Sequence, residues 1–77
     1  MKVSGKVLSV SNTTLTVQGS STTYVIDGSM AKVTDNSKNT GDIENVEVND
    51  TITAFGHFAT STNILSARII GDTSRTF

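Results

Sequence analysis

Polar and apolar residues alternate along several short segments of this chain, and alternation with a period of two is typical of half-buried β-strands. The segments that alternate are residues 14–18, 23–27, 51–58 and 64–70. In the last of these we expect Leu65, Ala67 and Ile69 to face a hydrophobic core. The pattern therefore predicts strands, joined by connections rich in Ser, Thr, Asn and Gly.

The first strand covers residues 2–10, and its apolar positions change parity part of the way along. Val7 belongs to one parity, whereas Leu8 and Val10 take the other. Because a slip of one residue moves every following side chain to the opposite face, the change predicts a β-bulge near Val7 and Leu8. Gly5 also fits a long, bent strand of the kind that closes a small barrel.

The connections between the strands differ in length. Three of them read as tight turns, at residues 11–13, 19–21 and 59–63. The longer connection contains a short strand or a turn of helix at residues 29–34 and a polar loop at residues 35–41, which we expect to be exposed. It continues into one helical turn at residues 42–46, with Asp42 as its N-cap.

Three strands in a meander, a long connection and a C-terminal hairpin follow the order of an OB barrel, a five-stranded Greek-key fold. We therefore predict an all-β domain with a small five-stranded OB-like barrel, closed or partly open. A six-stranded barrel that uses residues 31–34 as an extra strand is the alternative. A single domain spans residues 1–77, with the barrel in 1–71 and a polar tail in 72–77.

The amino-acid composition of the chain limits the classes of function that it can have. The formal net charge is -1, with 6 Lys and Arg against 7 Asp and Glu along the chain, so there is no basic run to attract nucleic acid. The chain has no Cys, which excludes disulfides, thiol chemistry and cysteine metal sites. No apolar stretch approaches the ~20 residues of a membrane span, so we expect no membrane insertion. The first residues also lack the apolar region of a signal peptide.

Short segments across nearly the whole chain match one family pattern. They are Gly5-Lys6-Val7, Leu15-Thr16-Val17, Tyr24-Val25-Ile26-Asp27, Asp42-Ile43, Val46-Glu47-Val48-Asn49-Asp50 and Ile64-Leu65-Ser66-Ala67-Arg68-Ile69. In them the chain resembles the small bacterial β-barrel (OB-like) domains of unknown function found in exported or envelope-associated proteins. The resemblance implies an extracytoplasmic or secreted location and supplies no catalytic residues. Where that family has Val-Gly-Asp, this chain has Asn49, which tolerates the left-handed backbone conformation.

Two features hint at chemistry, but neither has the partners it needs. His57 is the only histidine, and a metal ligand or general base requires a second ligand or an orienting carboxylate. Its same-face neighbours, Thr53 and Phe55, are neither. The loop of residues 35–42 has oxygen side chains like a calcium loop, but its glycine comes one place late and Lys38 adds a positive charge. We therefore predict no metal, no cofactor and no enzymatic activity.

Aromatic side chains on the strands are the remaining candidates for an interaction surface. Tyr24 lies on the third strand, where an OB barrel can stack a base, and the cations that might line a path there are Lys6, Lys32, Lys38 and Arg68. Phe55 is on the outward face of its strand. If exposed, it indicates a contact with a neighbouring domain or chain. The alternative is that it lies under the helical turn at 42–46 and closes one end of the barrel.

These observations favour a non-enzymatic structural or binding module of a secreted or envelope protein. Its candidate interaction surface comprises Phe55, His57 and Tyr24, and its partner is another protein or a second copy. Self-association would use free edges of the strands at 51–58 and 64–70. The alternative is an OB-type binder of single-stranded nucleic acid or oligosaccharide, and nucleic acid is disfavoured by the negative net charge.

Overall fold

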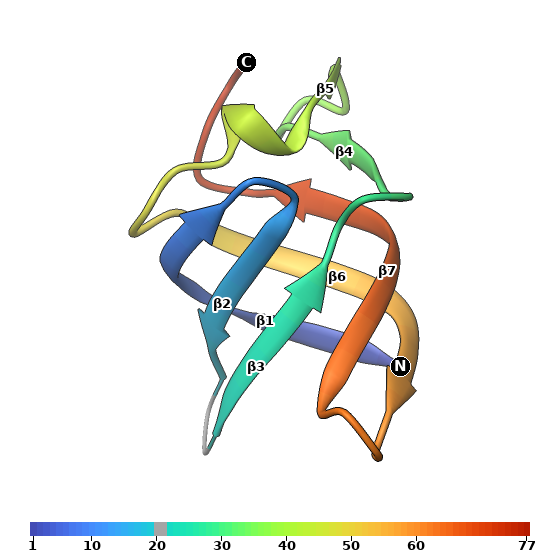
Figure 1. Ribbon diagram of the computed structural model, residues 1–77. Coiled ribbons are helices and arrows are strands. Elements are labelled where there is room, and N and C mark those ends of the chain that lie inside the picture. The colour runs from blue at the N-terminus through green and yellow to red at the C-terminus, as the bar shows by residue number, and fades with distance from the viewer. Residues whose placement is uncertain (20–21) are drawn as a thin grey trace.

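The computed structural model describes residues 1–19 and 22–77 (Figure 1). The predicted turn at 19–21 includes Ser20 and Ser21, which lie outside the described residues. The elements are, in chain order, β1 (Lys2–Ser11), β2 (Thr14–Gln18), β3 (Thr23–Asp27), β4 (Lys32–Thr34), β5 (Thr40–Gly41), the 3-10 turn η1 (Ile43–Asn45), β6 (Thr51–Ala59) and β7 (Ile64–Asp72). Among the described residues, no helix is long and apolar enough to cross a membrane.

The strands form one sheet in the order β3-β2-β1-β6-β7-β4-β5, and a further pairing of β3 with β7 closes it. The closed ring is therefore β1-β2-β3-β7-β6, with β3 and β7 parallel and its other pairs antiparallel. This confirms the predicted five-stranded all-β barrel. The short strand expected within residues 29–34 is β4, but it continues the sheet beside β7 instead of entering the ring, so the six-stranded alternative is wrong.

The first strand serves two neighbours because it is long and bulged. Its first half pairs with β6 and its second half with β2, and the register against β2 shifts between Val7 and Ser9. The bulge predicted near Val7 and Leu8 is confirmed, and it turns Leu8 out to solvent. Gly5 lies where β1 passes from its pairing with β6 to its pairing with β2, and a Cβ there would overlap the backbone carbonyl of Gln18.

A second bulge, in β7, overturns one inward assignment. Phe55 pairs with Ile69 but the next residue, Gly56, pairs with Ala67, so Arg68 is an extra residue on β7. The extra residue reverses the alternation beyond it. Leu65 and Ala67 are buried as predicted, whereas Ile69 points outward and is 48% exposed. Ile70 takes the inward place instead.

The core of the described residues consists of small aliphatic side chains, in agreement with the composition. Its buried members are Val3, Val7, Leu15, Val17, Ile26, Val33, Ile43, Val46, Ile52, Ala54, Leu65, Ala67 and Ile70. The predicted helical turn is present as η1, with Asp42 at the N-cap position and Asn45 accepting a hydrogen bond from the Asp42 N–H at 2.8 Å. Its Ile43 packs against Gly28, where a Cβ would collide with it. The turn therefore covers one end of the barrel.

Asparagines provide the left-handed backbone that the tight turns need. Asn12 has φ 52 in the turn between β1 and β2, and Asn63 has φ 57 in the turn before β7. Asn49 has φ 76, which confirms the left-handed conformation expected of it in the turn before β6. That turn is held against β1, because the Asn49 N–H donates to the Val7 carbonyl and the Val7 N–H donates to the Asp50 carbonyl, both at 2.8 Å.

The C-terminal residues, expected as a polar tail, dock on the barrel. Asp72 is the last residue of β7, and Arg75 donates to the Asp50 carboxylate at 2.9 and 3.3 Å. The Phe77 N–H donates to the Asp35 carboxylate at 2.8 Å, and its ring packs over Gly41. Residues 73–77 are therefore part of the folded structure.

The strand edges expected to pair with another copy are occupied over most of their length. β6 lies between β1 and β7, and β7 lies between β6 and, along its length, β3 and β4. The outermost strand of the extension is β5, which has only two residues. Little edge of these two strands is therefore left free, the clearest part being residues 57–59 of β6, which extend beyond the pairing with β1. The edge pairing between copies stays a prediction, restricted to such short segments.

Candidate functional site

A row of four exposed side chains crosses the outer face of the sheet. In register, Lys2 of β1 lies opposite Phe55 of β6, Phe55 opposite Ile69 of β7, and Ile69 opposite Lys32 of β4. Phe55 is 46% exposed and Ile69 is 48% exposed. Two large apolar side chains thus lie side by side on the surface, with a lysine at each end of the row. We expected Phe55 either to be exposed or to lie under the helical turn at 42–46. It is exposed and does not lie under η1.

The next row along the strands forms a groove beside the apolar pair. Ser4, Thr53, Gly71 and Thr34 follow one another across the same four strands. Because Gly71 has no side chain, the surface is hollowed there, and a Cβ added at Gly71 would lie 3.8 Å from the Thr34 hydroxyl with room to spare. The resulting groove has a volume of ≈ 440 Å³, which is within the range of ligand pockets. Its lining is Lys32, Thr34, Lys38, Thr53, Phe55, Ile69 and Gly71; we call it the Phe55 groove.

The charge around the Phe55 groove is positive. Lys32 and Lys38 line it, and Lys2 adjoins Phe55 in the neighbouring strand. None of the lining residues is acidic. The chain carries a net charge of only -1, but folding brings three of its six basic residues to one apolar surface. A ligand with negative charge and an apolar or aromatic part would match this site.

Tyr24 does not form the stacking platform that we expected. Its ring packs edge-on against Phe58, with ring centroids 6.3 Å apart and an interplanar angle of 83°. Both side chains are half-buried against the core and close the end of the barrel opposite η1. Two of the four cations predicted to line a path past Tyr24, Lys32 and Lys38, lie at the Phe55 groove instead.

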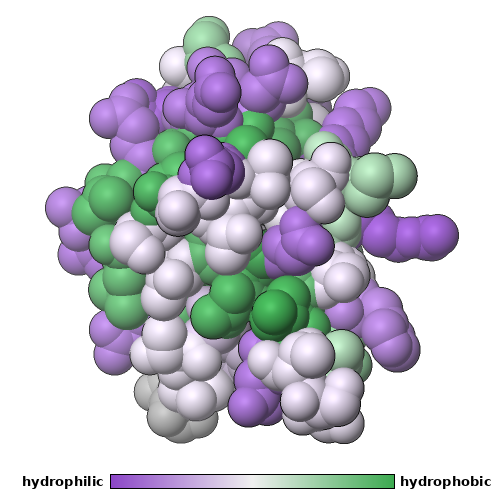
Figure 2. Space-filling view, in the orientation of Figure 1, coloured by the Kyte–Doolittle hydropathy of each residue, from purple (hydrophilic) through white to green (hydrophobic). Residues whose placement is uncertain are grey.

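The face on which OB barrels commonly bind oligonucleotides and oligosaccharides is chemically bland here. That face is the outer side of β2 and β3, and its cross-strand pairs are Thr14–Asp27, Thr16–Val25 and Gln18–Thr23. It carries no aromatic or basic side chain. Figure 2 views the molecule with β2 and β3 toward the reader, and the surface over them is mostly pale or purple with small hydrophobic patches.

His57 lies on the outer face of β6, opposite Ser66 of β7, and it is exposed. Within residues 1–19 and 22–77, no three His, Cys, Asp or Glu side chains are grouped so as to hold a metal ion. His57 and Tyr24 line neither of the two cavities described here. Of the three predicted interaction residues, Phe55 alone belongs to the Phe55 groove.

The loop that resembled a calcium site uses its carboxylate internally. Asp35 is buried, contrary to the exposed loop expected, and it accepts hydrogen bonds from the N–H groups of Ser37 and Asn39 at 2.8 Å. The Asn39 amide and the Phe77 N–H bind its second oxygen. Burial acts to raise the pKa of Asp35, but these donors outweigh it and hold the pKa well below its usual value. Through these hydrogen bonds the Asp35 carboxylate holds the 35–39 loop against the C-terminal residue.

Two buried aspartates, Asp50 and Asp72, and the half-buried Arg75 form a second polar cluster near the C-terminus. The Arg75 guanidinium, against the effect of burial, keeps the pKa of Asp50 low. Burial, followed by the hydrogen bond to Asp50, raises the pKa of Asp72 to about 6. Asp72 Oδ2 is buried with no donor among the described residues, which fits a proton shared between Asp72 and Asp50. None of these side chains lines either cavity. We therefore interpret the cluster as a structural contact that holds the C-terminal residues on the barrel.

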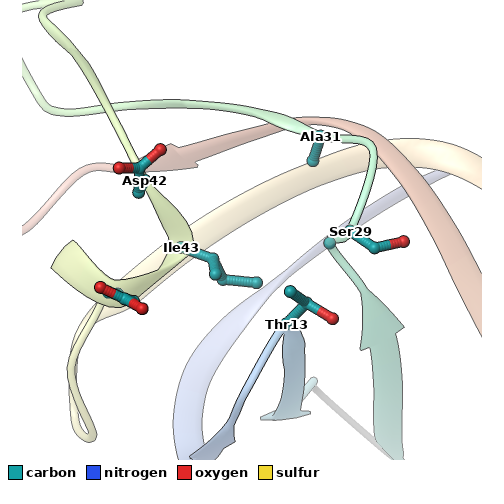
Figure 3. Close-up of a pocket in the computed structure, with 7 residues that line it drawn as sticks. Thr13, Ser29, Ala31, Asp42 and Ile43 are labelled. Atoms are coloured by element: carbon teal, nitrogen blue, oxygen red, sulfur yellow. The ribbon is translucent and has the colours of Figure 1, made fainter.

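The other cavity, of ≈ 280 Å³, lies above the barrel end between η1 and the turns that follow β1 and β3. Figure 3 shows the Ile43 side chain reaching across it toward Thr13 and Ser29. Asp42 and Glu44 supply negative charge at its rim, and both are exposed. No buried polar group points into it from the lining residues, so it is a weaker candidate than the Phe55 groove.

The comparisons with known proteins add no relative: no family model, curated protein or solved structure matches this chain. The resemblance to the exported β-barrel domains therefore stays a prediction.

Sequence reasoning found Phe55 but missed the rest of its groove. Strict alternation through β7 predicts that Ile69 faces the core, whereas the β7 bulge turns it outward. The available signal was the pair of adjacent isoleucines at 69 and 70, which cannot both face the core of a regular strand. Lys2 and Lys32 lie beside Phe55 and Ile69 only because four strands pair in one particular register. No local sequence pattern reveals that register.

Proposed function

We propose that this domain is a non-enzymatic binding module of a secreted or envelope protein, and that it associates with other copies through the Phe55 groove. The extracytoplasmic part of the proposal rests on the family resemblance. The binding part is carried by one observation, the exposed Phe55–Ile69 pair beside the hollow at Gly71. Large apolar side chains that remain exposed together on a small domain commonly mark an interaction site.

Most of the edges of β6 and β7 are occupied, which favours association through this face. Aromatic and aliphatic side chains at the centre of an interface contribute most of its binding energy, while surrounding polar groups exclude water. Thr34, Thr53 and Ser4 provide such a polar surround. The surface is small, so we expect weak association, with a dissociation constant on the order of 0.1–1 mM.

A second candidate function is binding of single-stranded nucleic acid in the same groove. One observation favours it: Phe55 has lysines on both sides of its row, and bases stack on aromatic rings along basic tracks. The site would then lie on a different face from the usual OB ligand surface. A single exposed aromatic and few cations leave this candidate second to self-association.

A Phe55→Trp variant tests which ligand occupies the groove. The chain has no natural Trp, so the emission of the variant reports on this position alone. We expect its emission to shift to the blue as the domain is concentrated, because a second copy excludes water from the ring. Titration with a short oligothymidylate at low and moderate salt provides the comparison, since nucleic-acid binding weakens steeply with salt.

A second substitution blocks the groove as a control. A Gly71→Val change in the same Phe55→Trp background fills the hollow, where a Cβ has room, and should abolish the shift without unfolding the domain. Emission that does not change with protein concentration would contradict self-association through the groove. A shift produced only by the oligonucleotide, and lost at moderate salt, would establish the second candidate instead.

A further inference from the structure

All four lysines of the chain lie around the Phe55 groove, although they are scattered in the sequence. Lys2 and Lys32 end the row of the two exposed apolar side chains, and Lys38 lines the groove. Lys6 lies on the same side of β1 as Lys2, because both belong to a stretch that pairs with β6 without a shift in register. We call the surface of the four lysines, Phe55 and Ile69 the lysine face.

Three aspartates are close to the lysine face in the sequence, but all of them are buried: Asp35, Asp50 and Asp72. The Asp35 carboxylate accepts hydrogen bonds from its own loop and from the Phe77 N–H, and Asp50 is paired with Arg75. The outward positions between the lysines carry Ser and Thr hydroxyls and the two apolar side chains. None of the three carboxylates is therefore available at the surface to pair with a lysine.

The remaining carboxylates of the chain lie elsewhere. Asp42 and Glu44 line the other cavity, at the barrel end covered by η1. Glu47 bridges Arg75 at 3.1 Å. Asp27 is the last residue of β3, which is not one of the four strands of the lysine face. The lysine face is therefore positively charged, although the net charge of the whole chain is only -1.

The lysine face has the composition of a surface that lies on an anionic lipid bilayer. Its centre is the half-exposed pair Phe55 and Ile69, and a lysine lies at each end of their row. Apolar side chains of this kind enter the region between lipid headgroups and acyl chains, while lysine ammonium groups stay at the level of the phosphates. Anionic lipids attract each such lysine. A nucleic acid would use this centre less fully, because Ile69 has no ring on which a base can stack.

From this charge and this apolar centre we propose that the lysine face docks on an anionic phospholipid surface. Phe55 and Ile69 enter the interface, and the lysines around them lie beside lipid phosphates. The contact is peripheral, and no segment of the chain crosses the bilayer. The inference rests on the part of the proposed function that makes the Phe55 groove a binding surface, and it adds a second occupant besides another copy. A domain bound in this way has its groove covered, so it does not associate with another copy through that groove.

Co-sedimentation with lipid vesicles tests this inference. The wild-type chain, far below the concentration at which copies associate, is mixed with vesicles of equal parts phosphatidylglycerol and phosphatidylcholine or of phosphatidylcholine alone, at low and moderate salt. Lys2→Gln with Lys32→Gln removes two charges, and Lys2→Arg with Lys32→Arg retains them as the matched control. Phe55→Ser removes the apolar centre, and Val48→Ser, at an exposed apolar residue outside the lysine face, is its control. All these side chains are exposed, so the variants should remain folded, which far-UV circular dichroism checks.

We expect the wild-type chain to bind the anionic vesicles at least about tenfold more tightly than the neutral ones, and more weakly as salt is added. The Gln double variant and Phe55→Ser should each bind the anionic vesicles about tenfold more weakly than wild type, and the two controls should bind like wild type.

Equal binding to both kinds of vesicle, or either test variant binding the anionic vesicles like wild type, would overturn the inference. A wild-type chain that binds a short oligothymidylate but not the anionic vesicles would also overturn it and would assign the lysine face to nucleic acid. These outcomes leave the proposed self-association in place. That proposal fails separately, if the wild-type chain without lipid stays monomeric at high concentration.

Discussion

Replacing Gly56 with alanine should destabilise the barrel by about 3 kcal/mol or more, enough to unfold much of a small domain. Gly56 lies at the β7 bulge, where a Cβ would overlap the Ser66 carbonyl oxygen and lie 2.7 Å from the Ala67 Cα. Both obstacles are backbone atoms of the paired strand. The overlap can be relieved only if β6 and β7 move apart. These two strands belong to the closed ring of the barrel and also line the Phe55 groove.

Gly71→Ala is the matched control for this prediction. It places the same methyl group on β7, but the nearest atoms, in Thr34 and Thr53, are 3.8 and 3.9 Å away. Because glycine in a strand has a large conformational entropy in the unfolded chain, this change should be neutral or stabilise by up to about 1 kcal/mol. Urea unfolding followed by circular dichroism measures both variants. Equal stabilities for Gly56→Ala and Gly71→Ala would show that the close approach at Gly56 is not required.

The second large effect is a gain of stability at alkaline pH in the Asp72→Asn variant. The pKa of Asp72 in the folded state is about 6, whereas a free Asp side chain has a value of about 3.9. The folded state therefore binds the proton more tightly, and the stability that this proton contributes is present at pH 4 and lost as the pH rises through 6. At pH 8 the ionised Asp72 should cost the wild-type domain about 2 kcal/mol.

Asparagine imitates the protonated carboxyl at every pH. Its oxygen can accept the hydrogen bonds that Ser74 now donates to Asp72 Oδ1, and its NH₂ can donate to Asp50. We therefore expect Asp72→Asn to be about 2 kcal/mol more stable than wild type at pH 8 and nearly equal to it at pH 4.5, by urea unfolding at both pH values. Glu44→Gln, at an exposed carboxylate, is the control. A wild-type stability that stays level between pH 4.5 and 8 would contradict the shared proton.

At acid pH, the stability of the folded domain changes with pH in the opposite direction. The pKa values of Asp35 and Asp50 are lowered in the folded state, so the stability they contribute is present above their ordinary pKa and is lost as the pH falls below it. Together with Asp72 they place the stability maximum in the mildly acidic range, near pH 4 to 5. The three buried aspartates thus act in opposite directions on the two sides of that maximum.

The architecture was predictable because its determinants are local. The alternation of polar and apolar residues predicted the barrel strands, and the parity change at Val7 and Leu8 predicted the first bulge. Asp42 and Ile43 predicted the helical turn. Asn49 also adopted the left-handed conformation expected of it. Each of these features depends on neighbours within a few residues, where steric preference and side-chain periodicity act directly.

The rest depended on contacts between distant parts of the chain. The β7 bulge results from how β6 and β7 pair, and it exposed Ile69 against the local pattern. The sequence predicted Asp35 as an exposed loop residue, because one of the donors that bury it, the Phe77 N–H, is 42 residues away. The Phe55 groove likewise brings together residues from three strands and the 35–39 loop. Buried carboxylates and composite surfaces of this kind leave no periodic trace in a sequence.

Sedimentation of the purified wild-type domain over a range of concentrations, beside Phe55→Ser, tests the central claim most directly. The groove account predicts that the wild-type chain forms larger species as its concentration approaches about 1 mM and that Phe55→Ser stays monomeric under the same conditions. A wild-type domain that remains monomeric throughout, or a Phe55→Ser domain that associates equally well, would contradict it.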